Sequence, residues 1–312
     1  MIFIAGGTGF VGSSLIEELQ REGIPLRCLV RTPEKGLRLK ERGIEFHAGD
    51  ITDRESLRGA LKGVDTVIHL VGIMEGRPED FKKVHVEGTK NLLDEALSSG
   101  IKTFFYQSAL GASIKGDTPY EKTKAMAEEL VKASGIPYII FRPSLLIGKI
   151  DGFTKRLMEV IKSLPVIPVP GDGNSRFQPL FIDDWIKAFR IAVIERKERN
   201  RLYELGGPEH LTYNEIIKTM SSQMGVNKPV IHIPIWILKA GLPAGRLIKS
   251  ITGLDIPLPT IDQLKLLKKD NITLPDAIKK EFGFEPRRYR DYISEVLQNS
   301  RPISGASNSL GH

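Results

Sequence analysis

Tyr120 and Lys124, in the stretch TPYEKTKAMAEE, lie four residues apart. In a helix this spacing places both side chains on one face, one turn apart. An ammonium beside a phenol favours the phenolate, so such a pair can exchange a proton with a carbonyl oxygen. The same stretch is also an ordinary helix start, because Thr118, Pro119 and Glu121 form a capping box with proline at the first helical position. The choice between these interpretations depends on what the rest of the chain brings to the helix.

The N-terminal stretch IFIAGGTGFVGSSLIEEL predicts a strand, a glycine turn and a helix in that order. Gly7, Gly9 and Gly12 satisfy the spacing G-x-G-x-x-G, and Gly6 extends it to G-x-x-G-x-x-G. A pyrophosphate needs such a turn, because the backbone must approach it closely and a helix N-terminus must point at it. The alternative is a glycine-rich turn without a ligand. The residues predicted to hold the nucleotide here are Gly6, Gly7, Thr8, Gly9, Phe10, Val11 and Gly12.

The end of the second predicted strand bears on which nucleotide is bound. An acidic residue at this place binds the ribose 2′-hydroxyl of NAD(H), whereas an arginine suits the 2′-phosphate of NADP(H). Here the strand ends in CLVRTPEK, with Arg31 at the position of the acid and Thr32 and Lys35 close behind it. We therefore predict a preference for NADP(H), with NAD(H) as the second option. An exposed arginine at a strand end is the other interpretation.

The elements that position these residues alternate between strands and helices, which predicts a doubly wound α/β fold around a parallel sheet. The predicted strands are Met1–Ala5, Leu26–Val30, Glu45–Ala48, Thr66–Val71, Thr103–Gln107, Tyr138–Phe141 and the stretch RLYELGG. The predicted helices are Val11–Glu22, Asp53–Leu61, Phe81–Ser98 and Tyr120–Ala133. Residues 1–150, with 176–207 returning to them, form the nucleotide-binding domain. Residues 151–175 and 208–300 form a smaller, mainly helical domain with capping boxes at Thr212 and Thr260, and residues 301–312 form a flexible tail.

Composition excludes several classes of function. The net charge of +7 invites a nucleic-acid partner, but the basic residues are interleaved with acidic ones and no nucleic-acid-binding motif is present, so we predict none. The single cysteine, Cys28, lies in an apolar run and forms no internal disulfide. No cluster has metal-ligand spacing, and no apolar run approaches the length of a membrane-spanning helix. With no leader before the first strand, we expect a cytoplasmic protein, with a peripheral contact at the inner face of a membrane left open.

Several motifs together carry a family resemblance. GGTGFVG, AGDITD, VHVEGTKNLLDEA, YEKTK and FRPSLLIG resemble the short-chain dehydrogenase/reductase superfamily in its extended and atypical branches. PGDGNSRFQPLFIDDW and PLPTIDQLKLLKKDN are similar to the nucleotide-binding accessory subunit of respiratory complex I and its bacterial relatives. The resemblance extends to about Asn271. It implies a Rossmann fold and a catalytic group of serine, tyrosine and lysine.

The resemblance assigns roles to individual residues. Ser108, twelve residues before Tyr120, matches the serine of that group. Lys124 would also hold the nicotinamide ribose. One departure is His85, which stands where many extended members carry asparagine and so leaves the usual structural hydrogen bonds of that position open. The other residues that the resemblance places beside the cofactor are Asp50, Ile51, Val71 and Gly72.

The substrate pocket is expected between the strand ends and the later helices. Phe141 and Pro143 close the sixth strand, and we expect both beside the cofactor, with Arg142 and Ser144 near the substrate. Gln178 and Pro179 precede a predicted strand that ends at Asp183. No motif identifies the small-molecule substrate.

One segment of the smaller domain mixes apolar and basic residues. Ile233–Leu254 contains Trp236 with Lys239, Arg246 and Lys249, and Pro243 interrupts it. Such a segment can pack over the substrate pocket or lie in a membrane interface.

The leading functional prediction is an NAD(P)(H)-dependent oxidoreductase that acts on a carbonyl, alcohol or quinone-like substrate. The first alternative is a nucleotide-loaded accessory or assembly protein, with a subunit of a membrane respiratory complex as partner. A nucleotide-sugar epimerase or dehydratase is a further alternative. This last alternative is weakened by the short sequence spacing between Ser108 and Tyr120 and by the lack of a sugar-nucleotide signature.

Overall fold

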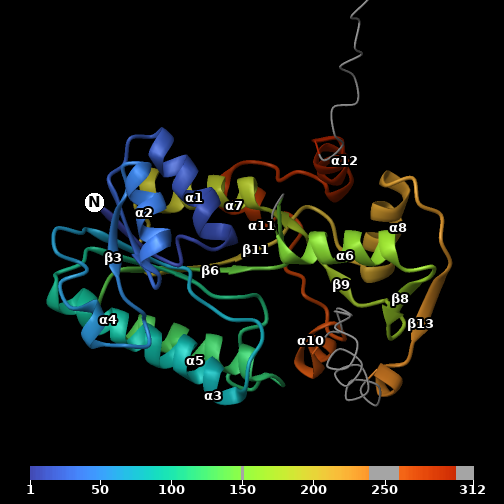
Figure 1. Cartoon of the computed structure of the whole chain (residues 1–312), viewed down its shortest axis with the longest axis horizontal. Helices are drawn as coiled ribbons and strands as arrows, with labels where there is room; N and C mark the ends of the chain where they lie inside the picture. The colour runs from blue at the N-terminus through green and yellow to red at the C-terminus, as the bar shows by residue number, and fades with distance from the viewer. Residues whose placement is uncertain (149–150, 239–259, 300–312) are drawn as a thin grey trace, which may run out of the picture.

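A seven-stranded sheet forms the centre of the computed structural model, which describes residues 1–148, 151–238 and 260–299 (Figure 1). Its strand order is β3-β2-β1-β4-β5-β6-β11, and every neighbouring pair is parallel. The strands are β1 (Ile2–Ala5), β2 (Leu26–Val30), β3 (Glu45–Ala48), β4 (Thr66–His69), β5 (Thr103–Gln107), β6 (Tyr138–Pro143) and β11 (Arg201–Leu205). The order reverses between β1 and β4, and ligands of such sheets bind at the strand ends beside this reversal.

Helices cover both faces of the sheet, as Figure 1 shows. On one face lie α1 (Phe10–Arg21), α2 (Pro33–Glu41), α7 (Ile182–Phe189) and α11 (Ala277–Phe282), which share a core cluster with the strands. On the other lie α4 (Gly88–Ser98) and α5 (Pro119–Ala133), with a second cluster. The strands of such a two-faced sheet are apolar along their whole length, and β1 is accordingly buried at each of its positions. The predicted fold class is confirmed.

Three differences from the predicted helices have local causes. The helix predicted over Asp53–Leu61 is only a 3₁₀ turn at Glu55–Leu57, because the chain turns into the left-handed region at Gly59, where φ is +73°. Helix α2 was not predicted, although Pro33 occupies its first turn. The helix predicted from Phe81 begins earlier, with α3 (Pro78–Phe81), and continues through a π-helical turn, η2 (Lys82–Glu87), into α4.

The smaller domain has its own core cluster beside the sheet. Its helices are α6 (Gly152–Ser163), α8 (Tyr213–Gln223), α10 (Ile261–Leu266) and α12 (Tyr289–Asn299), and its strand pairs are β8 (Ile167–Pro170) with β13 (Val230–Ile233) and β9 (Arg176–Phe177) with β12 (Leu211–Thr212). The capping boxes predicted at Thr212 and Thr260 are both present. The exact domain boundaries stay a prediction.

The connection back to the sheet also differs from its prediction. The pair β7 (Leu146–Ile147) and β10 (Leu180–Phe181) is parallel, and β10 ends at Phe181 rather than at Asp183. Helix α7 begins at Ile182 and continues into the π-helical turn η3 (Arg190–Glu195). Asp183 therefore lies in the first turn of α7, where a carboxylate interacts favourably with the helix dipole.

Two predictions fall wholly or partly on residues outside the described ranges. They are the flexible tail, 301–312, and the part of the predicted interfacial segment from 239 to 254. Within the ranges that the structure describes, we find no helix long and apolar enough to cross a membrane.

Candidate active site

The glycine turn between β1 and α1 brings the backbone close to itself at two positions. A Cβ on Gly12 would lie 2.2 Å from the carbonyl oxygen of Gly6, so α1 can pack on the turn only with glycine there. Gly6 itself has φ +95°. Gly9 differs, because a Cβ there would meet only the Gly6 oxygen, at 3.3 Å, and otherwise point into open space. Gly9, the exposed N-cap of α1, has no side chain to cap the helix, so the first backbone N–H groups of α1 have no cap from the N-cap residue.

The other residues of this loop divide between surface and core. Thr8 is exposed, and Val11 is half-buried among the residues that pack on the core. The Phe10 ring packs against Gly148, where an added Cβ would lie 2.7 Å from it. Gly7 is buried, and a Cβ there would lie 3.0 Å from the Cys28 sulfur.

At the ends of β2 and β3, the structure places one exposed cation and one ordered turn. Arg31 is exposed, and Thr32 after it is the N-cap of α2, whose first turn contains Lys35, also exposed. Asp50 Oδ1 accepts hydrogen bonds from the backbone N–H and hydroxyl of Thr52, at 2.8 and 2.9 Å. Ile51 is buried against Gly88, and a Cβ added to Gly88 would lie 2.6 Å from the Ile51 side chain. Its side chain is thus part of the core, and Asp50 is the more accessible of the two.

The start of α5 is held by the predicted capping box. Thr118 Oγ1 accepts from the Glu121 N–H at 3.2 Å, and Glu121 Oε2 accepts from the Thr118 N–H at 2.9 Å. Tyr120 is half-buried in this first turn, with the rings of His85 and Phe81 edge-on to it at centroid distances of 5.7 and 6.4 Å. The capping box and the catalytic interpretation are therefore compatible, since the box fixes the turn that carries the tyrosine.

Lys124 lies one turn later and points at the end of β5. It is 4% exposed, and its Nζ donates to the carbonyl oxygen of Gln107 at 2.8 Å. The ammonium also lies 5.0 Å from the centroid of the Tyr106 ring. Burial lowers the pKa of Lys124 to about 8, an effect that the charge of Glu128 partly offsets. An ammonium has three donors, so this contact leaves two for a ligand.

Ser108 directly follows the carbonyl that Lys124 binds. It is 3% exposed, and its Oγ has no hydrogen-bond partner among the described residues. The side-chain oxygen Oε1 of Gln107 is also buried and has no hydrogen-bond partner among the described residues. Buried hydroxyl and amide groups are nearly always paired in folded proteins, so these two atoms are available to pair with a ligand or a water molecule.

Burial raises the pKa of Tyr120 to about 12. The expectation that Lys124 favours the phenolate is therefore not met in the protein alone, because desolvation of the phenol sets the direction of the shift. At neutral pH the phenol keeps its proton, which is the state that can donate to a substrate oxygen.

His85, which stands in place of the usual asparagine, forms structural hydrogen bonds of its own. The ring is 1% exposed; Nε2 accepts from the Ile73 N–H at 3.0 Å, and Nδ1 lies 2.9 Å from Thr123 Oγ1. Thr123 Oγ1 in turn donates to the carbonyl of Pro119 at 2.7 Å, so this network assigns the hydrogen to Nδ1. Burial and the nearby Lys124 lower the pKa of His85 to about 3. A neutral histidine thus connects the loop after β4 to Thr123 of α5.

Sequence analysis missed a second buried histidine. His69, at the end of β4, is fully buried, and its Nε2 lies 2.9 Å from Thr89 Oγ1, which donates to the carbonyl of His85. Burial, with a smaller contribution from Lys124, lowers its pKa to about 3. No local pattern marked His69, because one polar residue at the end of an apolar strand resembles many strand ends.

The remaining predicted residues lie around this group or beneath it. Val71 is half-buried, and a Cβ on exposed Gly72 would lie 3.2 Å from Lys124 Nζ. Phe141 is fully buried in the core, 5.0 Å from the Phe105 ring centroid, and only its carbonyl reaches the site, where it accepts from the Ser108 N–H at 2.8 Å. Pro143 is buried at the end of β6.

Arg142 and Ser144, which flank Pro143, make contacts that sequence analysis did not foresee. Arg142 forms a two-point ion pair with Glu128, at 2.8 and 2.7 Å. Ser144 donates to Asn271 at 2.7 Å. Both therefore connect the strand ends to neighbouring segments.

A hollow of about 1130 Å³ lies in the smaller domain, away from Tyr120, between the loop at Asp172, the end of β13 and Asp270. None of the buried unpaired side-chain atoms in the described ranges belongs to the residues that line this hollow. Among the described residues, no group of three or more His, Cys, Asp or Glu side chains is arranged to hold a metal ion.

The chain is similar in sequence to several known proteins. The sequence model of the NAD dependent epimerase/dehydratase family matches residues 2–206. The chain is 25% identical to NADH dehydrogenase [ubiquinone] 1 alpha subcomplex subunit 9, mitochondrial, of Arabidopsis thaliana over 94% of this chain and 76% of that protein. It is 30% identical to the photosystem II assembly factor Ycf39 of Cyanophora paradoxa, over 76% of this chain and 73% of the relative.

Two further similarities concern reductases. An NAD(P)H azoreductase of Xenophilus azovorans is 25% identical over 98% of this chain and 93% of its own length. The structure of an NADPH-dependent quinone oxidoreductase from Escherichia coli, complexed with NADPH, aligns with a TM-score of 0.74 and 20% identity, over 95% of this chain and all of that one (100%). At that identity the structural likeness shows the fold alone.

Proposed function

Because the chain belongs to the NAD dependent epimerase/dehydratase family, we propose that it is an NAD(P)(H)-dependent oxidoreductase of the short-chain type. In this proposal it transfers a hydride to or from a carbonyl, alcohol or quinone-like substrate. The observation that carries the proposal is the Ser108 hydroxyl, buried and without a partner among the described residues, directly after the carbonyl that Lys124 binds. Tyr120 lies one helical turn before Lys124, on the same face.

The residues present fit a nicotinamide nucleotide, which supplies or accepts the hydride when bound. Gly9 supports a pyrophosphate beside it, since the protein itself leaves space where a Cβ would be. Lys124, charged below about pH 8, has two donors left for the hydroxyls of a ribose. These features support binding at the ends of β1 and β4, where the strand order reverses.

For reduction, Tyr120 holds the proton that the substrate oxygen needs. Its raised pKa keeps the phenol protonated at neutral pH, and donation to that oxygen is general acid catalysis. Ser108 Oγ donates a hydrogen bond to the same oxygen and orients it. In the oxidative direction the phenol first loses its proton to solvent, the positive charge of Lys124 stabilises the phenolate, and the phenolate then accepts the proton of the substrate hydroxyl.

Arg31 supports a preference for NADP(H) over NAD(H). It is exposed at the end of β2, and the N-terminus of the nine-residue helix α2 follows it directly. A guanidinium and a helix N-terminus both attract a phosphate, so the 2′-phosphate would meet two favourable groups there.

A second function is favoured by one specific observation. The chain is similar over most of its length to a subunit named for mitochondrial NADH dehydrogenase and to an assembly factor named for photosystem II. We therefore carry the alternative of a nucleotide-loaded protein that assembles with a membrane respiratory complex, without turnover. It would act in the cytoplasm, at the inner face of the membrane.

Mass spectrometry of the ligand that copurifies with the protein, followed by assay against a panel of ketones, aldehydes and quinones, separates these functions. The proposal expects NADP(H) in the purified protein and oxidation of added NADPH by at least one class of acceptor. Bound NADP(H) with no turnover on any acceptor would favour the assembly function. A copurifying nucleotide sugar would contradict both and favour an epimerase or dehydratase.

A further inference from the structure

The segment 269–273, which follows α10 in the smaller domain, reaches the start of the helix that carries Tyr120. Lys269 Nζ lies 2.6 Å from Asp117 Oδ2 and 3.2 Å from Glu121 Oε1. Asp117 directly precedes the N-cap of α5, and Glu121 is in its first turn. One cation from the smaller domain therefore bridges two carboxylates on either side of Tyr120 in the sequence.

Glu121 is the residue that organises this helix start. It is only 6% exposed, and its Oε2 accepts from the N–H groups of Asp117 and Thr118 at 2.8 and 2.9 Å. Its other oxygen is the one that Lys269 binds. The preceding loop packs directly on it, since a Cβ on Gly116 would lie 2.5 Å from Glu121 Cβ. A buried carboxylate without a cation is costly, so removing Lys269 should loosen this turn.

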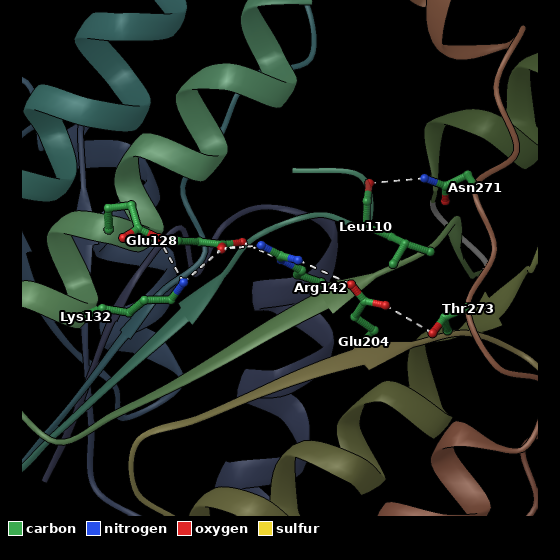
Figure 2. Close-up of polar contacts among 8 residues, drawn as sticks. Leu110, Glu128, Lys132, Arg142, Glu204, Asn271 and Thr273 are labelled. Atoms are coloured by element: carbon green, nitrogen blue, oxygen red, sulfur yellow. Dashed lines mark hydrogen bonds and ion pairs between the residues drawn. The ribbon is translucent and has the colours of Figure 1, made fainter. Parts of the chain in front are cut away.

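Two residues further on, Asn271 holds the loop that follows Ser108. Its Nδ2 donates to the carbonyl of Leu110 at 3.2 Å, as Figure 2 shows, and its Oδ1 accepts from Ser144 Oγ at 2.7 Å. Its backbone N–H donates to the backbone carbonyl of Arg176 in β9 at 2.8 Å. The same short segment thus contacts both elements of the proposed catalytic group, the loop after β5 and the start of α5.

A third connection reaches α5 through β11 and β6 and is visible in Figure 2. Thr273 Oγ1 donates to Glu204 Oε2 at 3.2 Å, and Glu204 Oε1 lies 3.3 Å from Arg142. Arg142 pairs with Glu128, which is 1% exposed and lies one turn after Lys124 on α5. The segment is therefore linked to α5 at its first turn and again at its third.

We propose that the segment 269–273 positions the catalytic group and that Lys269 is its principal positioning residue for Tyr120. Lys269 touches neither substrate nor cofactor; it acts through Asp117 and Glu121 on the turn that carries the phenol. The proposal rests on the proposed function for its catalytic consequence. Its structural part, that Lys269 orders the start of α5, stands independently of turnover.

The test compares Lys269→Met with Lys268→Met, because Lys268 is the adjacent, exposed lysine and its side chain forms no hydrogen bond or ion pair within the described part of the structure. Amide hydrogen exchange of residues 117–122 should become about tenfold faster in Lys269→Met, the effect of losing one charge-assisted hydrogen bond. Lys268→Met should match wild type, and Lys269→Arg should restore most of the protection. Unchanged exchange in Lys269→Met would overturn the proposal, whether or not the protein turns over.

If wild type reduces an acceptor, kcat should fall about tenfold to a hundredfold in Lys269→Met, while the Kd for NADPH stays within about twofold of wild type. In a Tyr120→Phe background the same substitution should leave kcat unchanged, because the group it positions is absent. An equal loss in both backgrounds would show that Lys269 does not act through Tyr120. Absence of turnover in wild type would count against the proposed function, and the exchange result would still decide the role of Lys269.

Discussion

Lys124 donates a hydrogen bond of 2.8 Å from Nζ to the backbone carbonyl of Gln107, the residue directly before Ser108. This contact joins α5 to the end of β5 and places a buried ammonium at the strand edge where such folds bind their ligands. Burying an ammonium is unfavourable, so a lysine that is only 4% exposed does not help the helix to fold. The relationship therefore favours a functional role over a merely structural one.

The pH dependence of nucleotide binding should report on this lysine. Burial lowers the pKa of Lys124 to about 8, so the ammonium loses its charge as the pH rises through that value. We expect the affinity for NADPH, followed by fluorescence titration between about pH 7 and pH 9.5, to fall across this range in wild type. Lys124→Met should bind NADPH more weakly at neutral pH and lose that step. Lys122→Met, an exposed neighbour on α5, should keep it; the same profile in Lys124→Met as in wild type would refute the assignment.

The choice between the two nucleotides should depend on Arg31. A guanidinium–phosphate contact contributes about 1.5–3 kcal/mol, so wild type should bind NADPH at least about tenfold more tightly than NADH. Arg31→Ala should remove most of this preference and leave the affinity for NADH nearly unchanged. Arg38→Ala, an exposed arginine on α2, is the matched control, and calorimetric titration gives all the constants. Equal affinities for NADPH and NADH in wild type would contradict the role of Arg31.

The buried histidines should make the fold sensitive to acid. His69 and His85 have folded-state pKa values of about 3 against an ordinary value of 6.5, so the unfolded chain binds more protons between these limits. The free energy of unfolding must therefore fall as the pH falls below 6.5, by about 1.4 kcal/mol per pH unit for each histidine. In urea unfolding without nucleotide, the unfolding free energy of His85→Asn should change with pH about half as steeply as that of wild type. His232→Asn, which changes an exposed histidine, should keep the wild-type slope, and an unchanged slope in His85→Asn would rule out the assignment.

A contact with an anionic membrane surface remains a prediction that part of the structure supports. Trp236 is 72% exposed and Ile237 is 43% exposed, while Lys239, Arg246 and Lys249 lie outside the described residues. We expect weak cosedimentation with phosphatidylglycerol vesicles at low salt, released by added salt because charges act over about 8 Å at physiological ionic strength. Trp236→Ser should reduce it. Failure of wild type to cosediment at low salt would leave packing on the protein itself as the role of this segment.

Local patterns predicted most of the sheet and the two principal motifs. The glycine turn and the capping box at Thr118 each depend on residues within a few positions of one another, so their types and spacing are visible in the sequence. Helix α2 was not predicted because PEKGLRLKE is rich in charge and contains Gly36. Glycine is needed there, since an added Cβ would lie only 2.6 Å from the Phe46 ring. The helix predicted at Asp53–Leu61 failed at Gly59, where only the backbone conformation revealed the break.

The contacts that complete the candidate site join residues far apart in the sequence. Lys269 reaches Glu121 across 148 positions, and Thr273 reaches Glu204 across 69. Neither pair has a spacing rule, because such contacts depend on how the smaller domain packs against the strand ends. The direction of the Tyr120 pKa shift was also not predicted, since burial sets it and burial depends on the packing of distant residues.

The most direct test of the catalytic account is the rate of NADPH oxidation by wild type and by Tyr120→Phe with the same carbonyl or quinone acceptor. The phenylalanine keeps the ring against His85 and Phe81 and removes only the hydroxyl. The account predicts that NADPH still binds while kcat falls by about 10²–10⁴-fold, the usual loss for a general acid. Wild-type turnover that is unaffected by the substitution would contradict it.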